Sequence, residues 1–232
     1  TCDEEVGCSG IRHFLEHQPF DVSGVIIGEP TSLRLATGEK GALWLKLKFK
    51  GRSAHGSQPQ SGINAVTRLF SCYTELSHEL GRIEGLTESL NMIRGGSKEN
   101  TVPDEAECVI DIRFEGNTDS SEVVSLVDRV LSKYNQSERI VLLSRESFCS
   151  SGNLTESVKE VLQKKAMNAE ELTMTYFTDG AFTASQGIET IILGPGSPSM
   201  AHRSNEYVEL EEVHKARALY VEVARNYFER TR

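Results

Sequence analysis

The stretch ALWLKLKFK, residues Ala42 to Lys50, marks the point where the chain changes from one style of strand to another. Its aliphatic and aromatic residues alternate with lysines, a period-2 pattern typical of a half-exposed strand in an antiparallel sheet. The earlier run VSGVIIG, Val22 to Gly28, is instead short and β-branched, which indicates a buried strand. This change of hydrophobic period predicts that a second domain begins near residue 40.

Residues 41–145 carry the pattern of a complete small domain. The order β-α-β-β-α-β predicts a four-stranded antiparallel sheet with both helices on one face, a ferredoxin-like α+β unit. Arg113 is expected on the other face, which must be open or cover something. The elements after the first strand are a helix from Ile63, a strand at 89–93, a strand at 106–114, a helix at 123–134 and a strand at 139–143.

The flanking residues, 1–40 and 146–232, have the character of an α/β domain. We therefore expect a fold of the α/β class, in which one α/β domain is interrupted by the inserted α+β domain at 41–145. The elements predicted after the insertion are a helix from Asn153 or Thr155 to Ala166, a strand at 172–178, a strand at 190–193 and a helix at 209–225.

Composition excludes several classes of partner. The formal net charge is −9 and no basic run is present, which argues against nucleic acid as a partner. No apolar run approaches the roughly 18 residues of a membrane span, which argues against a membrane. The five cysteines are odd in number and form no C-x-x-C, a usage that favours a reducing cytoplasm over a disulfide framework.

The first seven residues, TCDEEVG, contain an acidic triplet of Asp3, Glu4 and Glu5. Two neighbouring carboxylates suit hydrolysis at a metal, because one can take the proton of a water molecule while the other holds the metal. The alternative interpretation is a solvated helix N-terminus, where the helix dipole favours carboxylates. Other stretches of the chain are needed to decide between the two.

The helix predicted at 7–17 contains H-x-x-E-H, formed by His13, Glu16 and His17, which is a zinc-peptidase motif. At 100° per residue these side chains lie opposite the apolar stripe of Ile11, Phe14 and Leu15. We therefore interpret the motif as a solvated helix face rather than a metal site.

Two further candidates follow predicted strands. Glu29 comes directly after the strand at 22–28, at the edge where open α/β sheets bind ligands, although a turn residue before proline is an alternative. His202 follows the Gly/Pro/Ser loop after the strand at 190–193; its alternative is a surface histidine. His55 lies between small residues in a polar loop, unlike a core histidine.

Four stretches, in this order, resemble the co-catalytic dizinc aminoacylase and deacetylase family of metallopeptidases. The family includes acetylornithine deacetylase, succinyl-diaminopimelate desuccinylase and glutamate carboxypeptidases of the carboxypeptidase G type. The resemblance implies two zinc ions per full-length subunit, with cobalt or manganese as alternatives, and a homodimer formed by the inserted lid and dimerisation domain. The stretches are TCDEEVG at 1–7, GEP at 28–30, GRSAHGSQPQSGINA at 51–65 and GPGSPSMAHRSNEYVE at 194–209.

The resemblance also implies roles for individual residues. Glu4 corresponds to the general base, and Glu5 and His202 correspond to ligands of one zinc, while Glu29 corresponds to a ligand of the other. In the inserted domain, the residues matched to substrate-site positions are His55, which in the family reaches the active site of a partner subunit, Asn100 of E-N-T-V-P, and Arg113 of D-I-R. A guanidinium on the open face of the sheet could grip a substrate carboxylate with two hydrogen bonds; the alternative is an exposed arginine paired with Asp111 or Glu107.

The chain departs from the family pattern in one respect. Members carry an H-x-D motif and a bridging aspartate well before the acidic pair, and nothing precedes Thr1 here. We therefore expect the chain to be the C-terminal portion of a longer enzyme. Ligand counting then predicts that the chain alone hydrolyses nothing and holds no stable dizinc centre.

The expected activity of the parent is zinc-dependent amide hydrolysis that removes an acyl group from an N-acyl amino acid. The motifs resemble most the acetylornithine deacetylase and desuccinylase branch, which acts in amino-acid biosynthesis. Two alternatives stay open: a dipeptidase or carboxypeptidase of the same architecture, and a non-catalytic dimerisation module. For the dimer, the strand Ala42–Lys50 and the helix from Ile63 are the predicted surface, because sheet edges readily pair.

Overall fold

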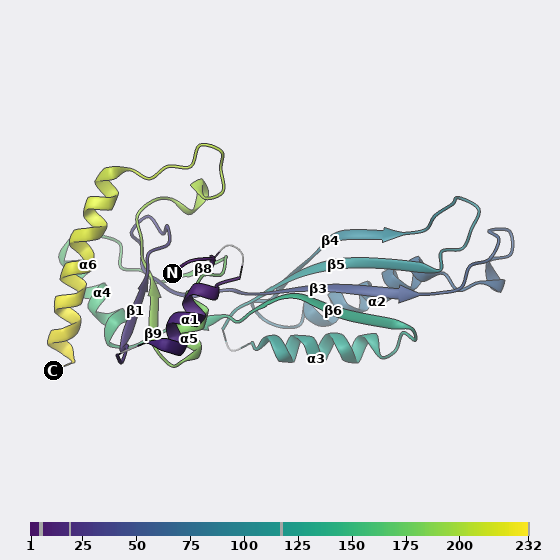
Figure 1. Cartoon of the computed structure of the whole chain (residues 1–232), viewed down its shortest axis with the longest axis horizontal. Coiled ribbons are helices and arrows are strands. Elements are labelled where there is room, and N and C mark those ends of the chain that lie inside the picture. The colour runs from purple at the N-terminus through teal and green to yellow at the C-terminus, as the bar shows by residue number, and fades with distance from the viewer. Residues whose placement is uncertain (5–6, 19, 117, 232) are drawn as a thin grey trace. The chain divides into compact units, whose positions relative to one another are not determined.

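The computed structural model describes residues 1–4, 7–18, 20–116 and 118–231, and it divides the chain into two compact units. Unit 1 consists of residues 1–40 and 148–232, and unit 2 consists of residues 41–147. Figure 1 shows each unit as a sheet with helices against it. The chain leaves unit 1 once and returns to it once, so unit 2 is an insertion.

Unit 2 has a four-stranded antiparallel sheet in the order β4-β5-β3-β6, the order of a ferredoxin-like unit. The long pairing of β3 with β5 runs from Gly41 opposite Phe114 to Lys50 opposite Glu105. This confirms the β-α-β-β-α-β fold predicted from the sequence. The elements are β3 (Gly41–Lys50), α2 (Ala65–Leu80), β4 (Thr87–Gly95), β5 (Glu105–Phe114), α3 (Ser120–Leu131) and β6 (Ser137–Arg145).

The core of unit 2 lies between this sheet and helices α2 and α3. Leu43, Leu45 and Leu47 of β3 are fully buried, as are Ile112 and Phe114 of β5. Each of these residues is two positions from the next along its strand, so one face of the sheet carries the apolar side chains. Both helices have side-chain caps: Asn64 accepts from the Thr67 amide at 3.0 Å, and Asp119 accepts from the Ser121 amide at 2.6 Å.

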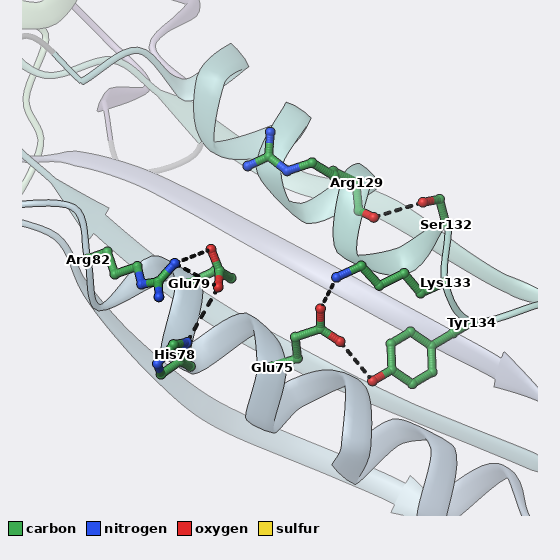
Figure 2. Close-up of polar contacts among 8 residues, drawn as sticks. All are labelled: Glu75, His78, Glu79, Arg82, Arg129, Ser132, Lys133 and Tyr134. Carbon is green, nitrogen blue, oxygen red and sulfur yellow. Dashed lines mark hydrogen bonds and ion pairs between the residues drawn. The ribbon is translucent and has the colours of Figure 1, made fainter.

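Polar contacts at the surface tie α2 to the end of α3 (Figure 2). Glu75 of α2 pairs with the Lys133 ammonium and accepts a 3.1 Å hydrogen bond from the Tyr134 hydroxyl. One turn later, Glu79 accepts from Arg82 at 3.2 Å. The Lys133 contact, followed by the Tyr134 hydrogen bond, lowers the pKa of Glu75 below its usual value. These contacts fix the two helices on the same face of the sheet.

One predicted surface is corrected by the strand order. The strand at 42–50 lies between β5 and β6, so it is an inner strand and has no edge available for pairing. The edges are β4 and β6. The alternation of apolar and polar residues along β3 indicates that one face of the sheet is open. It does not indicate an open edge, because the alternation depends on what covers each face and not on which strands lie on either side.

Unit 1 has a small mixed sheet in the order β1-β9-β2-β7, with β8 also pairing with β2. β1 and β9 are parallel, while β2 is antiparallel to both β9 and β7. The helices and strands are α1 (Ser9–His17), β1 (Gly24–Ile27), β2 (Ala36–Glu39), β7 (Phe148–Cys149), α4 (Asn153–Lys164), β8 (Leu172–Met174), α5 (Gly180–Ser185), β9 (Glu189–Ile192) and α6 (Leu210–Arg230).

Apolar residues cover both faces of this sheet. Ile191 and Leu193 belong to a buried cluster with α4 and α6, whereas Ile192 belongs to a second cluster that includes Ala181 of α5. The strand therefore sends alternate side chains into two cores. Helix α4 lacks a cap of its own: Glu189, at the start of β9, accepts from the amides of Leu154 at 2.9 Å and Thr155 at 2.8 Å. In the described part of the chain, no helix combines the length and apolarity that crossing a membrane requires.

The sequence misplaced several elements of unit 1. It missed β2 and β7, and it extended the strand at 172–178, which ends at Met174. The run at 22–28, predicted as buried, contributes the half-buried strand β1. Among the described residues β1 pairs with β9 alone, and a strand with one neighbour keeps an exposed edge.

Candidate functional site

Two of the predicted carboxylates in unit 1 lie around one phenol. Burial, followed by the negative charges of Glu29, Glu39 and Glu4, raises the pKa of Tyr176 to about 12. The Tyr176 hydroxyl donates a 3.0 Å hydrogen bond to the carbonyl oxygen of Pro30, the residue after Glu29. Glu4 and Glu29, which lie 25 positions apart in the sequence, are therefore both near enough to Tyr176 for their charges to act on its hydroxyl.

The loop that carries Glu29 is bonded to the loop that leads to His202. The amides of Thr31 and Leu33 donate to the Gly194 carbonyl oxygen at 3.2 and 2.9 Å. The Gly194 amide donates in return to the Thr31 hydroxyl at 3.1 Å. A Cβ on Gly194 would lie 2.4 Å from the carbonyl oxygens of both Gly28 and Glu29, so the close approach of the two loops requires glycine here.

His202 itself is exposed in the segment between this loop and α6. Its backbone has φ = 60°, the left-handed region, and its amide donates to Glu206 Oε2 at 3.1 Å. This contact fixes the backbone at His202 and engages Glu206 of the N-E pair. It does not itself bring the imidazole to Glu4 or Glu29.

Zinc takes carboxylate oxygens and imidazole nitrogens, so the donor chemistry of Glu5, Glu29 and His202 suits it. Glu5 lies outside the described residues. Over the ranges that the structure describes, no group of three or more His, Cys, Asp or Glu is arranged to hold a metal ion. The described part of the predicted ligand set does not by itself form a metal centre.

The structure adds two carboxyl groups that the sequence reasoning missed. Glu39, at the end of β2, is fully buried, and its Oε2 accepts a 2.7 Å hydrogen bond from the Thr178 hydroxyl. Asp179 is 6% exposed, and its Oδ2 accepts from the Thr1 hydroxyl. Asp179 follows a predicted strand, as Glu29 does, so the same edge rule could have found it. A short strand with the sequence ATGE gave no signal for Glu39.

In unit 2 the predicted residues His55 and Asn100 lie on adjacent loops. The Gly56 amide donates to the Asn100 carbonyl oxygen at 2.6 Å, and the Val102 amide donates to the Ala54 carbonyl oxygen at 2.9 Å. His55 Nδ1 lies 2.8 Å from the Ser57 hydroxyl oxygen, which orients the ring. Both side chains are exposed. Backbone hydrogen bonds thus place His55 and Asn100 on neighbouring loops at one end of the sheet.

Arg113 lies at the opposite end of the same sheet. It pairs with Ala42 across β3 and with Thr87 across β4. Its Nε and Nη2 donate to the two carboxylate oxygens of Asp111 at 2.7 and 3.1 Å. The pairing with Asp111 that the sequence left open is therefore present, and it orients the planar guanidinium on the open face.

The two ends of the unit 2 sheet are too far apart to share a small molecule. Eight residue steps separate Ala42, beside Arg113, from Lys50, the last residue before the loop of His55. At about 3.3 Å per residue this is roughly 26 Å, several times the length of an acyl amino acid. One copy of the chain cannot place both His55 and Arg113 on the same substrate molecule.

The H-x-x-E-H motif of α1 faces solvent, as the sequence predicted. His13, Glu16 and His17 are all exposed, while Ile11 on the other side is buried. The two imidazole rings stack with centroids 4.2 Å apart, and His17 Nδ1 lies 2.9 Å from the His13 carbonyl oxygen. These contacts hold one ring against the other along the helix surface.

Comparison with known proteins finds one family model and several relatives that are similar to this chain. A family model described as a peptidase dimerisation domain matches residues 37–139. The acetylornithine deacetylase of Vibrio cholerae is 29% identical over 230 residues, which cover 91% of this chain and 59% of that protein. A protein of Aspergillus clavatus described as a probable carboxypeptidase is also 29% identical, over 92% of this chain and 54% of its own length.

Two solved structures share the fold. A tripeptidase from Staphylococcus aureus superposes with a TM-score of 0.78 at 21% identity, over 95% of this chain and 61% of its own. The aminopeptidase PepT from Bacillus cereus gives a TM-score of 0.81 at 18% identity, over 97% of this chain and 62% of its own. The matched region therefore covers between 54% and 62% of the length of these four proteins.

Proposed function

We propose that this chain, which belongs to the metallopeptidase family of aminoacylases and deacetylases with a peptidase dimerisation domain, is part of an enzyme that hydrolyses the amide bond of an N-acyl amino acid. The observation that carries the proposal is that the charges of Glu4 and Glu29 both act on Tyr176, whose hydroxyl bonds the loop of Glu29. The 29% identity to an acetylornithine deacetylase supports the substrate class. Zinc is the proposed metal, with Glu5 and His202 as ligands of one ion and Glu29 as a ligand of the other.

In unit 1, Glu4 is the proposed general base. A carboxylate beside the reacting water can accept its proton and deliver it to the leaving amine. Tyr176 holds the Glu29 loop through Pro30 and stays protonated over the whole physiological range, since its pKa is about 12. The phenol therefore adds no negative charge to the cluster.

In unit 2, His55, Asn100 and Arg113 are the proposed substrate-contacting residues. His55 and Asn100 would stabilise the oxygen that becomes negative during attack, and Arg113 would hold the substrate carboxylate. Because the two ends of the sheet lie roughly 26 Å apart, His55 and Asn100 must serve one substrate and Arg113 another. This supports a homodimer in which each copy lends its His55 loop to the other.

The edge strand β4 and helix α2 offer a surface for that dimer. In the described residues β4 pairs only with β5, which leaves its outer edge open to a second strand. Met92 of β4 is 51% exposed and Phe70 of α2 is 49% exposed. Light scattering at tens of micromolar should report a dimer, and Phe70→Glu should convert it to a monomer, whereas Phe20→Glu, at an exposed phenylalanine of unit 1, should not.

Activity tests the proposal directly. An enzyme containing this chain should hydrolyse N-acetylornithine, and Glu4→Gln should abolish turnover. A carboxypeptidase specificity, which the Aspergillus relative favours, would appear instead as release of C-terminal residues from dipeptides. No hydrolysis of either class, with zinc present, would favour the non-catalytic dimerisation module and overturn the proposal.

Complementation tests the shared site. Glu4→Gln and His55→Ala should each be inactive alone, but mixed dimers would contain one site with both residues intact. Random exchange of a twofold dimer should restore about a quarter of the wild-type activity. Absence of any recovery after verified exchange would place His55 in the site of its own copy. That this chain alone holds no dizinc centre stays a prediction, to be checked by metal analysis after dialysis against micromolar zinc.

A further inference from the structure

Glu39 is a buried carboxyl group that the proposed reaction does not use. The side chain has no exposed surface, and within the described residues its Oε1 has no hydrogen-bond partner. Removing a carboxylate from water costs several kcal/mol unless a cation or several donors compensate for it. A group in this position is most stable as the neutral acid.

A neighbouring negative charge also favours the neutral form of Glu39. Glu4 is the charged group whose field acts on it, and a second negative charge disfavours ionisation. On the strands beside β2, Phe148 and Met174 lie directly opposite Glu39. Among the residues of β7 and β8 that pair with β2, the titratable side chain is that of the exposed Cys149, opposite Gly38. Burial therefore raises the pKa of Glu39 to about 8, although the Thr178 hydroxyl and the amides of Thr178 and Ala181 lower it.

The contacts of Glu39 lead to the acidic site. Its carboxyl group accepts from the Thr178 hydroxyl at 2.7 Å, and the same hydroxyl accepts from the Gly180 amide at 2.8 Å. Between them lies Asp179, whose carboxylate accepts from the Thr1 hydroxyl three residues before Glu4. Two sets of hydrogen bonds, joined by the backbone of the turn 178–180, thus connect Glu39 to the segment that carries Glu4.

We propose that Glu39 is a positioning residue that, as a neutral acid, fixes the turn Thr178–Gly180 and through it the segment of Glu4, and that loss of its proton releases this turn. An ionised Glu39 would repel Glu4 and would draw water into the core between β2 and α5. The acidic site would then be assembled below the pH of this ionisation and loosened above it. The inference rests on the proposed function only where activity is measured.

The direction of the pH effect follows from linkage. The folded-state pKa of about 8 lies above the ordinary value of 4.5, so the stabilising proton is bound more tightly in the folded state. Stability from this group is fully present below about pH 4.5 and is lost as the pH rises through about 8. Glu39→Gln keeps the shape and a neutral side chain but cannot ionise, so it should remove this dependence.

Thermal unfolding from pH 5.5 to 9.5 tests the inference without any assay of activity. The wild-type chain should lose roughly 5 °C in Tm over this range, whereas Glu39→Gln should stay level and match or exceed the wild type at pH 9. Glu229→Gln, at an exposed glutamate of α6, is the matched control and should follow the wild type. An equal pH slope in wild type and Glu39→Gln would overturn the proposal.

Hydrogen exchange, corrected for the intrinsic rate at each pH, locates the effect. Peptides covering 178–185 should exchange at least threefold faster at pH 9 than at pH 6 in the wild type but not in Glu39→Gln, and peptides of β3 should be unchanged in both. Uniform change across both units would indicate global destabilisation and contradict a positioning role. If Glu39→Gln does not fold, Thr178→Ser and Thr178→Val replace it: the serine should retain protection at pH 6 and the valine should lose it.

The activity arm separates this inference from the proposed function. In an enzyme containing this chain, kcat should fall above about pH 8 in the wild type and persist in Glu39→Gln, with KM changed less than twofold. Absence of hydrolysis in both proteins would refute the proposed function and leave the stability and exchange results to decide the role of Glu39. An alkaline limb identical in both would count against the positioning role.

Discussion

Unit 2 is built from one continuous segment of the chain, whereas unit 1 is built from two segments that are distant in the sequence. The sheet of unit 2 uses strands of nine or ten residues from one continuous segment, and a single buried cluster lies under it. The sheet of unit 1 uses strands of two to four residues, joins β1 to β9 across 165 sequence positions at Gly24 and Glu189, and divides its apolar residues between two clusters. All the strands of the unit 2 sheet therefore come from one segment, whereas the unit 1 sheet needs strands from both sides of the insertion.

The candidate residues follow the same division. In unit 2, His55 and Asn100 are placed by backbone hydrogen bonds between adjacent loops, so their side chains can vary without loss of geometry. In unit 1, the Tyr176 hydroxyl bonds the backbone beside Glu29 and the Thr178 hydroxyl bonds the Glu39 carboxyl group, so side chains take part in the placement. Substitutions should therefore disturb the site of unit 1 more easily than that of unit 2.

The largest loss of stability is expected from a substitution in the core of unit 2. Phe114→Ala removes a fully buried ring from β5 and should cost about 3–5 kcal/mol of unfolding free energy. Val109→Ala, on the partly exposed face of the same strand, should cost under about 1 kcal/mol. Calorimetry should show the transition of unit 2 moving while that of unit 1 stays. Equal movement of both would mean that the units unfold as one.

A glycine substitution should damage unit 1 in the same way, though less. Gly194→Ala puts a Cβ 2.4 Å from the backbone oxygens of Gly28 and Glu29, which should force the two loops apart at a cost of roughly 2–3 kcal/mol. Gly187→Ala is the control, because its φ of +75° is strained for alanine but nothing lies within 4 Å. That change should cost about 1 kcal/mol. Denaturant unfolding distinguishes them, and similar costs would exclude steric contact as the cause.

The role of Arg113 in unit 2 can be tested by comparing substrates with and without a free carboxylate. Arg113→Lys keeps the charge but loses the planar fork, so it should weaken transition-state binding of substrates with a free carboxylate by about 1–3 kcal/mol in kcat/KM. The corresponding substrate amides should lose far less. Asp111→Asn, which leaves the guanidinium in place but weakens its orientation, should show a smaller loss with the same selectivity. An equal loss for acids and amides would assign Arg113 a structural role.

The smallest expected effect concerns a surface ion pair of unit 2. Arg139 donates to both carboxylate oxygens of Asp128, at 2.7 and 2.9 Å, and this hydrogen bonding lowers the pKa of Asp128. Because the folded pKa lies below the ordinary value of 3.8, the stabilisation is present above that value and lost as the pH falls through the folded pKa. Asp128→Asn should cost about 0.2–1 kcal/mol at pH 7, measured by urea unfolding in low salt, and nothing at pH 2. A loss at pH 2 as large as that at pH 7 would rule out the charge as its source.

Sequence pattern predicted unit 2 well because its long strands repeat a period of two. The segments Leu43 to Phe49 and Ala106 to Phe114 each contain several repeats of this alternation. That is enough to predict the strands, the buried face of the sheet and the fold of the unit. β2 and β7 were missed because four residues of ATGE and two of FC carry no period at all. What defines these strands is pairing with β9, β8 and each other, which no local pattern reports.

The site divides along the same line. Glu4, Glu29, His55 and Arg113 could be proposed because motifs and strand ends mark them in the sequence. Glu39 could not, since its importance comes from burial against residues 139 positions away, at Thr178. The pairing of His55 with Asn100, and their separation from Arg113, follow only from the register of β3 with β5. A linear sequence names candidate groups, but sheet register decides which of them can act together.

The strand pairs on either side of the crossing between the units have an evolutionary consequence. Glu39 lies opposite Phe148 in β2 and β7, and Ala42 lies opposite Arg145 in β3 and β6, so the outgoing and returning chains are neighbours on both sides. A segment whose two ends meet can be removed and replaced by a short turn at little cost in loop entropy. The inserted unit could therefore be removed or replaced as a whole without changing the sheet of unit 1. Lineages could have gained, lost or exchanged it by a single recombination event while the host sheet kept its register.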